Sequence, residues 1–250
     1  MVQTNALVTN VEKCGPFVRV VLSVPEIAQG LAPGRFISAD LGDYLRTPLF
    51  PAWLDAEGFD VLVPPNHPAA ALRPGAGVDL VGPLGRGFEV SIEASRLLLV
   101  AATDHLPALL PLAQQKPGFY VALLLSAPTA AALYPVRLLP PSLEVHIVTA
   151  DGSAGHQGPV LDLFPELVRW ADCVCIADDP TTYPALAEIV REVRIGPGER
   201  FAQALVVPPN AFQCAMACGV GACRGCAVQV ARGTKLACTD GPVFNLLELR

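Results

Sequence analysis

Short runs of alternating apolar and polar residues occupy roughly the first 90 positions of the chain, and glycine and proline separate them. Residues 6–25 carry two such runs on either side of a Gly-Pro pair, and residues 34–43, 59–64 and 78–90 continue the pattern. An alternation of period two is typical of strands with one buried face. Regularly spaced short strands of this kind predict a small antiparallel β-barrel.

The pattern changes near Ser91, where continuous apolar runs begin to alternate with helix-like stretches. Continuous apolar strands are typical of a parallel sheet that helices cover on both faces. The expected strands lie at residues 95–102, 119–127, 143–151 and 173–179. The expected helices lie at residues 105–115, 129–135, 158–170 and 182–193.

The composition shifts once more after residue 207, because residues 210–250 hold five of the eight cysteines. We therefore predict a mixed β and α/β fold in three parts. The barrel spans residues 1–92, the parallel-sheet α/β domain spans 93–207, and a small cysteine-rich module spans 208–250.

Charge and hydropathy exclude some classes of function. A net charge of −6 gives no electrostatic reason to bind nucleic acid or an anionic membrane. The most apolar stretch, residues 119–136, contains Pro128 and Pro135, so we predict no membrane span. The N-terminus lacks the pattern of a signal peptide, so we expect a cytoplasmic protein. Clustered cysteines in a reducing compartment more often hold metal than form disulfides.

Four cysteines follow a specific spacing: Cys218-x4-Cys223-x2-Cys226, and then eleven residues to Cys238. This spacing is typical of plant-type 2Fe–2S ligation. Such a cluster needs a tight loop that turns its thiolates inward, and three glycines within the loop suit that demand. The sequence predicts that these four cysteines bind a 2Fe–2S cluster.

Two other uses of the cysteines fit less well. Structural zinc favours two closely spaced ligand pairs, whereas this chain has one C-x-x-C. Disulfides need an oxidising compartment. Cys214 lies outside the four-ligand pattern, and we interpret it as a small buried residue. We expect Cys173 and Cys175 to be core residues on opposite faces of a strand.

The stretch "MACGVGACRGC" and the later "ACTDGPVF" resemble the cluster module in electron-transfer subunits of NAD-dependent dihydroorotate dehydrogenases. Those subunits belong to the ferredoxin–NADP reductase-like superfamily. Residues 31–43, 80–90 and 149–164 are similar to further family segments, in the expected order. The resemblance implies a flavin-binding barrel, an NAD-binding α/β domain and a 2Fe–2S module. It also implies electron flow from NADH through FAD and the cluster to the flavin of a partner subunit, in pyrimidine biosynthesis.

The flavin motif departs from the family. Family members carry an Arg-Pro-x-Ser type motif, in which the arginine binds the flavin pyrophosphate. Here Thr47 stands in place of that arginine and Phe50 in place of the serine. The resemblance leaves Arg46, Thr47, Pro48 and Leu49 as the candidate FAD contacts, and we leave FAD binding open.

The nucleotide motifs depart further. No glycine lies between Ala101 and Pro107, where a dinucleotide phosphate would need close backbone approach. Asp178 and Asp179 stand where the family carries Cys-Gly beside the nicotinamide. Carboxylates there repel phosphate, so we predict that NAD(P)H does not bind.

The principal hypothesis is an iron–sulfur electron-transfer subunit with no catalytic residue of its own. Its expected partner is a dihydroorotate dehydrogenase-like flavoprotein or another oxidoreductase. One alternative is a structural or redox-sensing subunit that has lost flavin and NAD chemistry. Another is an intact FAD-dependent NADH reductase with unusual contacts.

Overall fold

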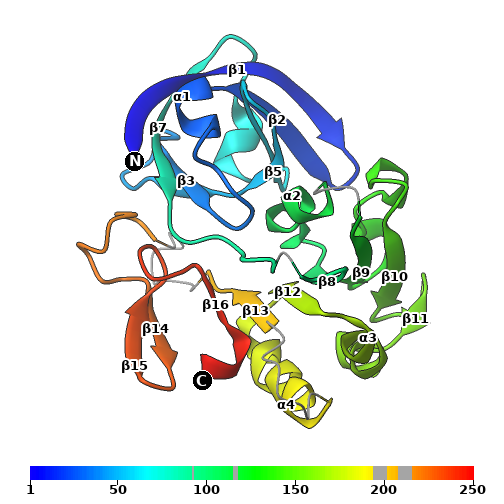
Figure 1. The fold of residues 1–250 in the computed structure, drawn as a ribbon. Helices are drawn as coiled ribbons and strands as arrows, with labels where there is room; N and C mark the ends of the chain where they lie inside the picture. Colours follow the sequence, from blue (N-terminus) through cyan, green and yellow to red (C-terminus); the bar gives the residue numbers. More distant parts are fainter. Residues whose placement is uncertain (92, 115–117, 194–201, 208–215) are drawn as a thin grey trace.

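The computed structural model describes residues 1–91, 93–114, 118–193, 202–207 and 216–250, which form two large sheets and a two-stranded ribbon (Figure 1). The N-terminal sheet curls around its own core above the second sheet. Within the described residues, no helix is both long and apolar enough to cross a membrane.

The N-terminal sheet is antiparallel throughout, with the strand order β4-β3-β7-β1-β2-β6-β5. Its strands are β1 (Val2–Cys14), β2 (Phe17–Ser23), β3 (Phe36–Ala39), β4 (Thr47–Leu49), β5 (Pro51–Leu54), β6 (Gly58–Val63) and β7 (Gly77–Leu84). Helix α1 (Pro25–Ala28) and the 3-10 turn η1 (Pro68–Ala71) fill the connections. Alternate residues such as Val20, Leu22 and Leu80 face a shared core, which confirms the antiparallel prediction.

The second sheet has the order β11-β10-β9-β8-β12-β13-β16, and β16 alone runs antiparallel to its neighbour. Its strands are β8 (Arg96–Ala102), β9 (Tyr120–Ala127), β10 (Glu144–Thr149), β11 (His156–Gln157), β12 (Cys173–Ala177), β13 (Ala202–Leu205) and β16 (Val243–Asn245). The predicted parallel sheet is therefore confirmed.

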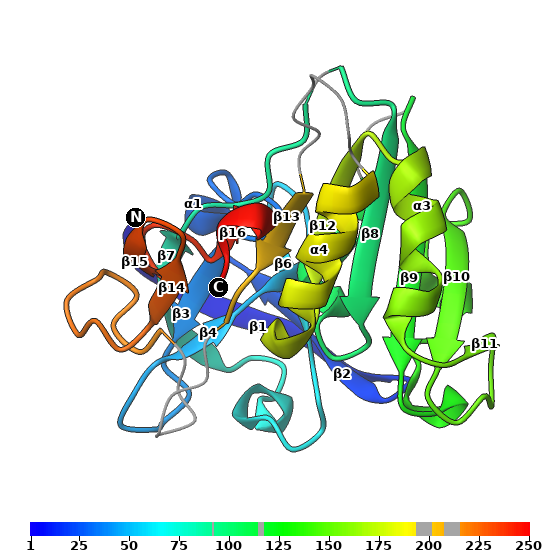
Figure 2. The same cartoon turned by 90° about the horizontal axis from the view of Figure 1, so that it is seen from below.

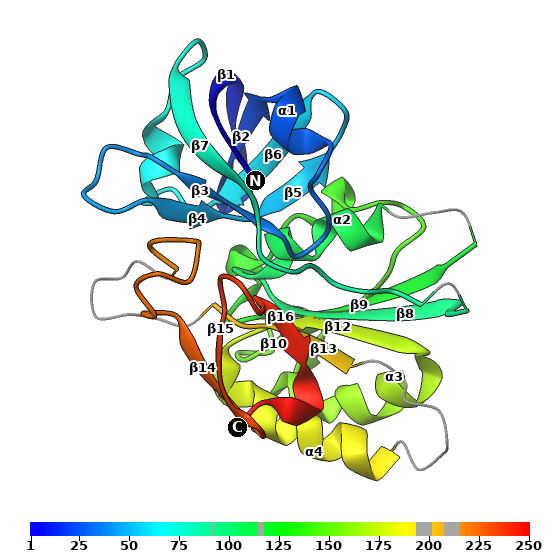
Figure 3. The same cartoon turned by 60° about the vertical axis from the view of Figure 1, so that its left-hand side comes forward.

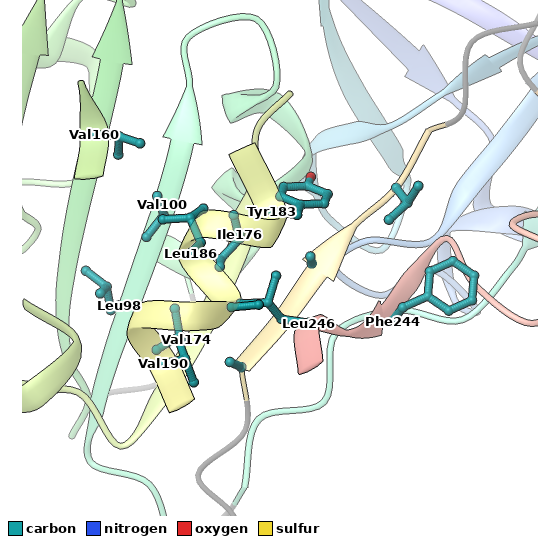
Figure 4. Packing of buried hydrophobic residues seen from close by; sticks show 14 of the residues in the cluster. Leu98, Val100, Val160, Val174, Ile176, Tyr183, Leu186, Val190, Phe244 and Leu246 are labelled. Carbon is teal, nitrogen blue, oxygen red and sulfur yellow. The ribbon is translucent and has the colours of Figure 1, made fainter. Parts of the chain in front are cut away.

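Helices α3 (Phe164–Trp170) and α4 (Tyr183–Val193) cover one face of this sheet, as Figures 2 and 3 show. The buried apolar residues of both helices pack against apolar residues of β8 and β12, and Figure 4 shows Leu186 and Val190 of α4 in this layer. Helix α2 (Leu110–Ala113) and the barrel cover the other face.

The helical segments in the connections after β8 and β9 are shorter than the helices that the sequence predicts there. Of the predicted helix at 105–115, the described residues 105–114 contain the 3-10 turn η2 (Leu106–Ala108) and one turn of α2, and residues 129–135 contain the 3-10 turn η3 (Ala130–Ala132). Prolines at 107 and 111 interrupt the first stretch. Each proline lacks an N–H and cannot continue an α-helical ladder. The 3-10 turns η4 (Val136–Leu138), η5 (Val160–Asp162) and η6 (Pro180–Thr182) complete the connections.

The placement of Cys173 and Cys175 corrects one prediction. Both thiols lie in the core between the sheet and the barrel, together with Leu97 and Leu99. They are core residues as expected, but they share a face, because residues two apart on a strand point the same way. Val174, between them, faces α4 instead.

The C-terminal residues form a separate hairpin and also complete the second sheet. Strands β14 (Ala227–Val230) and β15 (Gly233–Leu236) form a separate hairpin, whereas β16 completes the second sheet and the 3-10 turn η7 (Leu246–Glu248) packs beside α4. The Arg86 N–H donates to Gly241 O at 2.5 Å where the chain leaves the barrel. The C-terminal residues therefore hold the two sheets together.

Asp172 ties the start of β8 to the start of β12. Its carboxylate accepts hydrogen bonds from the Ser95 and Arg96 amides and pairs with the Arg96 guanidinium at 2.8 Å. The hydrogen bond from the Arg96 side chain is the main cause that holds the pKa of Asp172 well below its usual range. The Asp172 carboxylate therefore stabilises the folded protein fully when the pH is above about 3.9, the pKa of an aspartate in the unfolded chain. This stabilisation is lost progressively as the pH falls from there through the lower pKa of the folded state.

We expect Asp172→Asn to lower the free energy of unfolding by roughly 1–2 kcal/mol at pH 7, as for a partly exposed charged hydrogen-bonded pair. Urea unfolding of both proteins at pH 7 and pH 3 measures this. The difference in free energy of unfolding between the two proteins should be smaller at pH 3 than at pH 7. An equal or larger difference at pH 3 would contradict the stabilising role of the Asp172 carboxylate.

Candidate iron–sulfur centre and neighbouring clefts

One thiol pair is set by the β14–β15 hairpin. Strand β14 begins directly after Cys226, and β15 ends two residues before Cys238. The antiparallel register pairs Ala227 with Leu236, so the two cysteines lie side by side. Their Sγ atoms are 3.3 Å apart.

Cys218 and Cys223 form the second pair, in the loop before the hairpin. The Cys223 N–H lies 3.5 Å from Cys218 Sγ, and the Gly225 N–H lies 3.5 Å from Cys223 Sγ. Gly219 and Gly221 have φ values of 65° and 80°, a left-handed conformation that glycine adopts without steric cost. The loop can therefore turn its amides toward the sulfurs.

The two pairs differ in exposure and in how readily their thiols ionise. Cys226 and Cys238 are buried, whereas Cys223 is exposed. Burial opposes ionisation of Cys218, but amide donors, chiefly those of Cys223 and Val220, outweigh it and lower the pKa of Cys218 to about 7. Burial and the neighbouring Cys226 thiol raise the pKa of Cys238 to about 12. A metal that binds Cys238 must therefore displace a firmly held proton.

The donor set fits a two-iron cluster. Four thiols are present as two pairs, and a 2Fe–2S cluster takes four thiolates, two on each iron. A single ion would need several ligands that converge on one point. In residues 1–91, 93–114, 118–193, 202–207 and 216–250, no such group of three or more His, Cys, Asp or Glu side chains is found.

The cluster loop packs against the barrel at Gly219. A Cβ built on this residue would lie 2.8 Å from Leu84 Cδ1 and 3.9 Å from Ser38 Cβ. Leu84 ends β7, and Ser38 lies in β3. The absence of a side chain at Gly219 therefore lets the loop rest directly on these two strands.

We expect Gly219→Ala to lower the thermal stability of the metal-loaded protein. Alanine at a φ of 65° costs about 1–2 kcal/mol, and its Cβ would meet Leu84 Cδ1, which must shift. Thermal unfolding measures the loss, and an unchanged melting temperature would contradict the packing of the loop described here.

The candidate FAD contacts lie on or beside β4. Arg46 forms an ion pair with Asp79 and donates hydrogen bonds to Ser38 O at 3.4 Å and Asp79 O at 3.1 Å, so its guanidinium lies along the barrel strands. Thr47 and Pro48 are half-buried. Leu49 points into the barrel core. A phosphate at Arg46 would compete with the Asp79 carboxylate.

A cavity of about 220 Å³ lies beside this strand, between the barrel and the second sheet. Its wall is mostly apolar and includes Pro48, Phe50 and Leu62. Burial lowers the pKa of His67 in this wall, and its Nδ1 accepts the Ala69 N–H. An apolar wall suits a flat aromatic ring, but the lining residues that the structure describes include no lysine or arginine for a pyrophosphate.

A second cavity, of about 460 Å³, opens at the carboxyl ends of β8, β9, β10 and β12. This is the crevice in which open α/β sheets bind ligands. We call it the acidic cleft, because its titratable lining residues are Asp104, His105, Asp178 and Asp179. The carboxylates expected after β8 and after β12 therefore meet in one site.

Three backbone amides beside the acidic cleft already have partners. The Asp179 N–H donates to Asp178 Oδ1 at 2.7 Å, and the Thr181 N–H donates to Asp179 Oδ1 at 2.8 Å. After β8, the His105 N–H donates to Ala102 O at 2.9 Å. The absence of NAD(P)H binding stays a prediction.

Several features of the site are not evident from the sequence. Ser38, 2% exposed, lies beneath the cluster loop, and its hydroxyl has no hydrogen-bond partner in the described part of the chain. Tyr183 links the end of β12 to the end of β13. Neither residue belongs to a local motif that would have identified it. The prediction for Cys214 falls outside the described residues.

Comparisons with known proteins bear on both the module and the whole chain. Residues 214–250 match the family model described as the iron-sulfur cluster binding domain of dihydroorotate dehydrogenase B. The structure of the NADH-dependent reduced ferredoxin-NADP oxidoreductase is similar at a TM-score of 0.81 and 25% identity, over 98% of this chain and 89% of that one. The ferredoxin reductase in carbazole 1,9a-dioxygenase, at 15% identity, has a TM-score of 0.65, over 78% and 67% of the two chains, and shares the fold.

Two relatives of known name cover most of the chain. The dihydroorotate dehydrogenase B (NAD(+)) electron transfer subunit of Bacillus caldolyticus is 34% identical over 189 residues, which is 72% of this chain and 68% of the relative. That of Geobacillus thermodenitrificans is 30% identical over 249 residues, 92% and 91% of the two chains. Together with the paired thiols and the shared fold, this similarity shows that the chain belongs to the family of electron-transfer subunits of dihydroorotate dehydrogenase B.

Proposed function

We propose that this protein holds a 2Fe–2S cluster on four cysteines and passes single electrons between a redox donor and a dihydroorotate dehydrogenase catalytic subunit. The observation that carries the proposal is the arrangement of two thiol pairs around one loop and hairpin. The proposed ligands are Cys218, Cys223, Cys226 and Cys238. When bound, such a cluster supplies a one-electron carrier.

The residues around the loop define where a partner would approach. Cys226 and Cys238 form the buried edge of the site, and Cys223 forms its exposed edge. Two exposed apolar side chains lie in segments near that edge. Val220 is in the loop itself, and Tyr44 is in the β3–β4 connection. Figure 3 shows this connection on the same side of the molecule as the loop before β14. We propose that the partner subunit covers this surface, because exposed aromatic and apolar residues mark protein interfaces.

We further propose that this chain does not accept hydride from NAD(P)H. Among its described lining residues the acidic cleft has three carboxylates, and the Asp179 and Thr181 amides are already paired, which disfavours a dinucleotide phosphate. The apolar cavity beside Pro48 can accept a flavin ring, but its described lining residues provide no lysine or arginine for the pyrophosphate. The proposed route of electrons does not depend on a flavin in this chain.

The three-part division at 1–92, 93–207 and 208–250 remains our proposal for the domains. We also propose a cytoplasmic location. It is supported by the close spacing of the four proposed ligands, because clustered cysteines in a reducing compartment more often hold metal than form disulfides.

The test is to purify the full chain without oxygen and to record its visible and EPR spectra before and after dithionite. We expect about two iron and about two sulfide ions per chain. The visible absorbance should fall on reduction with dithionite and return on reoxidation. A cluster that cannot be reduced reversibly would favour the structural alternative. A second sample is treated with NADH and then with acid. Flavin that is bleached by NADH in the folded protein and later released by acid would favour the intact reductase.

A further inference from the structure

The segment that carries three of the four proposed cluster ligands has a single charged side chain. From Phe201 to Ala231 the sequence contains no aspartate, glutamate or lysine, and its one arginine is Arg224. Arg224 directly follows Cys223, which forms the exposed edge of the site. A chain with a net charge of −6 therefore places one isolated positive charge beside a proposed ligand.

The backbone conformation of Arg224 is unusual for an arginine. Its φ is 56°, in the left-handed region that glycine adopts without steric cost and that other residues adopt only at a cost. The next residue is Gly225, whose N–H lies 3.5 Å from Cys223 Sγ. Glycine would make the same turn, as Gly219 and Gly221 do earlier in the loop. The backbone therefore does not account for an arginine here, and the costly conformation indicates a role for the side chain.

The guanidinium of Arg224 is not neutralised by a carboxylate of the described chain. Arg224 is exposed, and it takes part in none of the ion pairs formed among the described residues. The Asp240 carboxylate, two residues after Cys238, instead accepts the Leu236 N–H at 2.8 Å. The positive charge is therefore available to act on the site.

The proposed cluster is a group on which a nearby cation has a defined effect. Four thiolates and two sulfides carry more charge than two ferric ions, so the assembly is an anion. Reduction adds one electron from the donor, with no bond made or broken, and makes that anion more negative. A neighbouring cation thus stabilises the reduced form more than the oxidised form. Because Arg224 and Cys223 are adjacent, their side chains stay well within the Debye length of dilute salt, about 30 Å.

We propose that the Arg224 guanidinium raises the reduction potential of the cluster from its exposed edge, and so favours acceptance of an electron from the partner subunit. This inference rests on the proposed function and deepens it, because it names the side chain that tunes the electron carrier. Arg224 is not a ligand in this account and acts through its charge alone.

The test is a reductive titration of the full cluster-containing chain with dithionite and redox mediators, followed by EPR in dilute salt. We expect Arg224→Gln to lower the one-electron reduction equilibrium constant about threefold to tenfold. A tenfold change corresponds to a potential about 59 mV lower. Arg224→Lys keeps the charge and should stay within about twofold of the unaltered protein. In about 1 M salt, where the Debye length is about 3 Å, the effect of Arg224→Gln should shrink.

Two further variants separate charge from structure. Arg232→Gln removes the same charge from the β14–β15 turn, at the end of the hairpin away from the cluster loop (Figure 1), and should change the equilibrium constant by less than about twofold. Arg224→Gly removes the charge but suits the positive φ, so it should fold and show the same lowered potential as Arg224→Gln.

Three results would overturn the inference. They are an unchanged potential in Arg224→Gln and Arg224→Gly, a potential in Arg224→Lys as low as in Arg224→Gln, and an effect of the same size at both salt concentrations. Each of these concerns a cluster that is reversibly reduced, so the proposed function would stand. A cluster that dithionite cannot reduce in the unaltered protein would overturn the proposed function and this inference together.

Discussion

Replacing Cys226 by alanine removes most of the iron from the protein, whereas replacing Cys175 by alanine leaves the iron content unchanged. Both thiols are buried, at 1% and 0% exposure, so the two variants remove a sulfur of similar accessibility. They differ in their surroundings, because Cys226 lies 3.3 Å from Cys238 Sγ, whereas Cys175 lies in the apolar core of the second sheet. Three thiolates leave one iron of a two-iron cluster under-coordinated.

Iron analysis and visible absorbance of the anaerobically purified variants measure the difference. A folded Cys226→Ala protein with a full complement of iron would contradict the assignment of this ligand. Equal loss of iron from Cys175→Ala would show that the effect follows from core destabilisation instead. Far-ultraviolet circular dichroism of both variants establishes that each is folded.

Replacing Phe36 by alanine destabilises the whole chain and also changes the environment of the cluster. Phe36 is fully buried in the core that joins the barrel to the cluster module, and its ring centroid lies 6.0 Å from that of Phe50. Loss of a buried phenyl ring costs about 3–5 kcal/mol in the free energy of unfolding. The cavity left behind lies on the side of the barrel that carries Leu84, against which the cluster loop packs.

Phe164→Ala is the matched control, because Phe164 is equally buried but lies in α3, on the far face of the second sheet (Figure 3). We expect similar losses in denaturant unfolding for the two variants. Only Phe36→Ala should shift the EPR spectrum of the reduced cluster. A shift of the same size in Phe164→Ala would mean that the barrel contact does not shape the cluster environment.

Local patterns in the sequence are sufficient to predict the two sheets of the fold. Alternating residues predict the antiparallel sheet and continuous apolar runs predict β8, β9 and β12, because these periodicities follow from which faces are buried. Within the helix-like stretch at 105–115, the described residues 105–114 instead form a 3-10 turn and one α-helical turn, since its prolines outweigh its apolar content. The assignment of Cys173 and Cys175 to opposite faces was wrong, although strand periodicity alone predicts that they share one.

The thiol set was predicted from spacing, because three of its members lie within nine residues. Contacts between distant segments could not be predicted in this way. Arg46 is paired with Asp79, 33 residues away, and Asp104 meets Asp178 in one cleft only because β8 and β12 are neighbours in the sheet. Strand order is a long-range property, so the acidic cleft emerges only when the sheet is assembled.

We propose that this chain carries electrons through its cluster and does not take them from NADH. The most direct measurement is anaerobic EPR of the full chain mixed with a dihydroorotate dehydrogenase catalytic subunit. We predict that dihydroorotate reduces the cluster in the mixture within the turnover time of the catalytic subunit, and that NADH added to this chain alone does not reduce it. Rapid reduction of the cluster by NADH in the absence of the partner, or no reduction by dihydroorotate in its presence, would contradict the account.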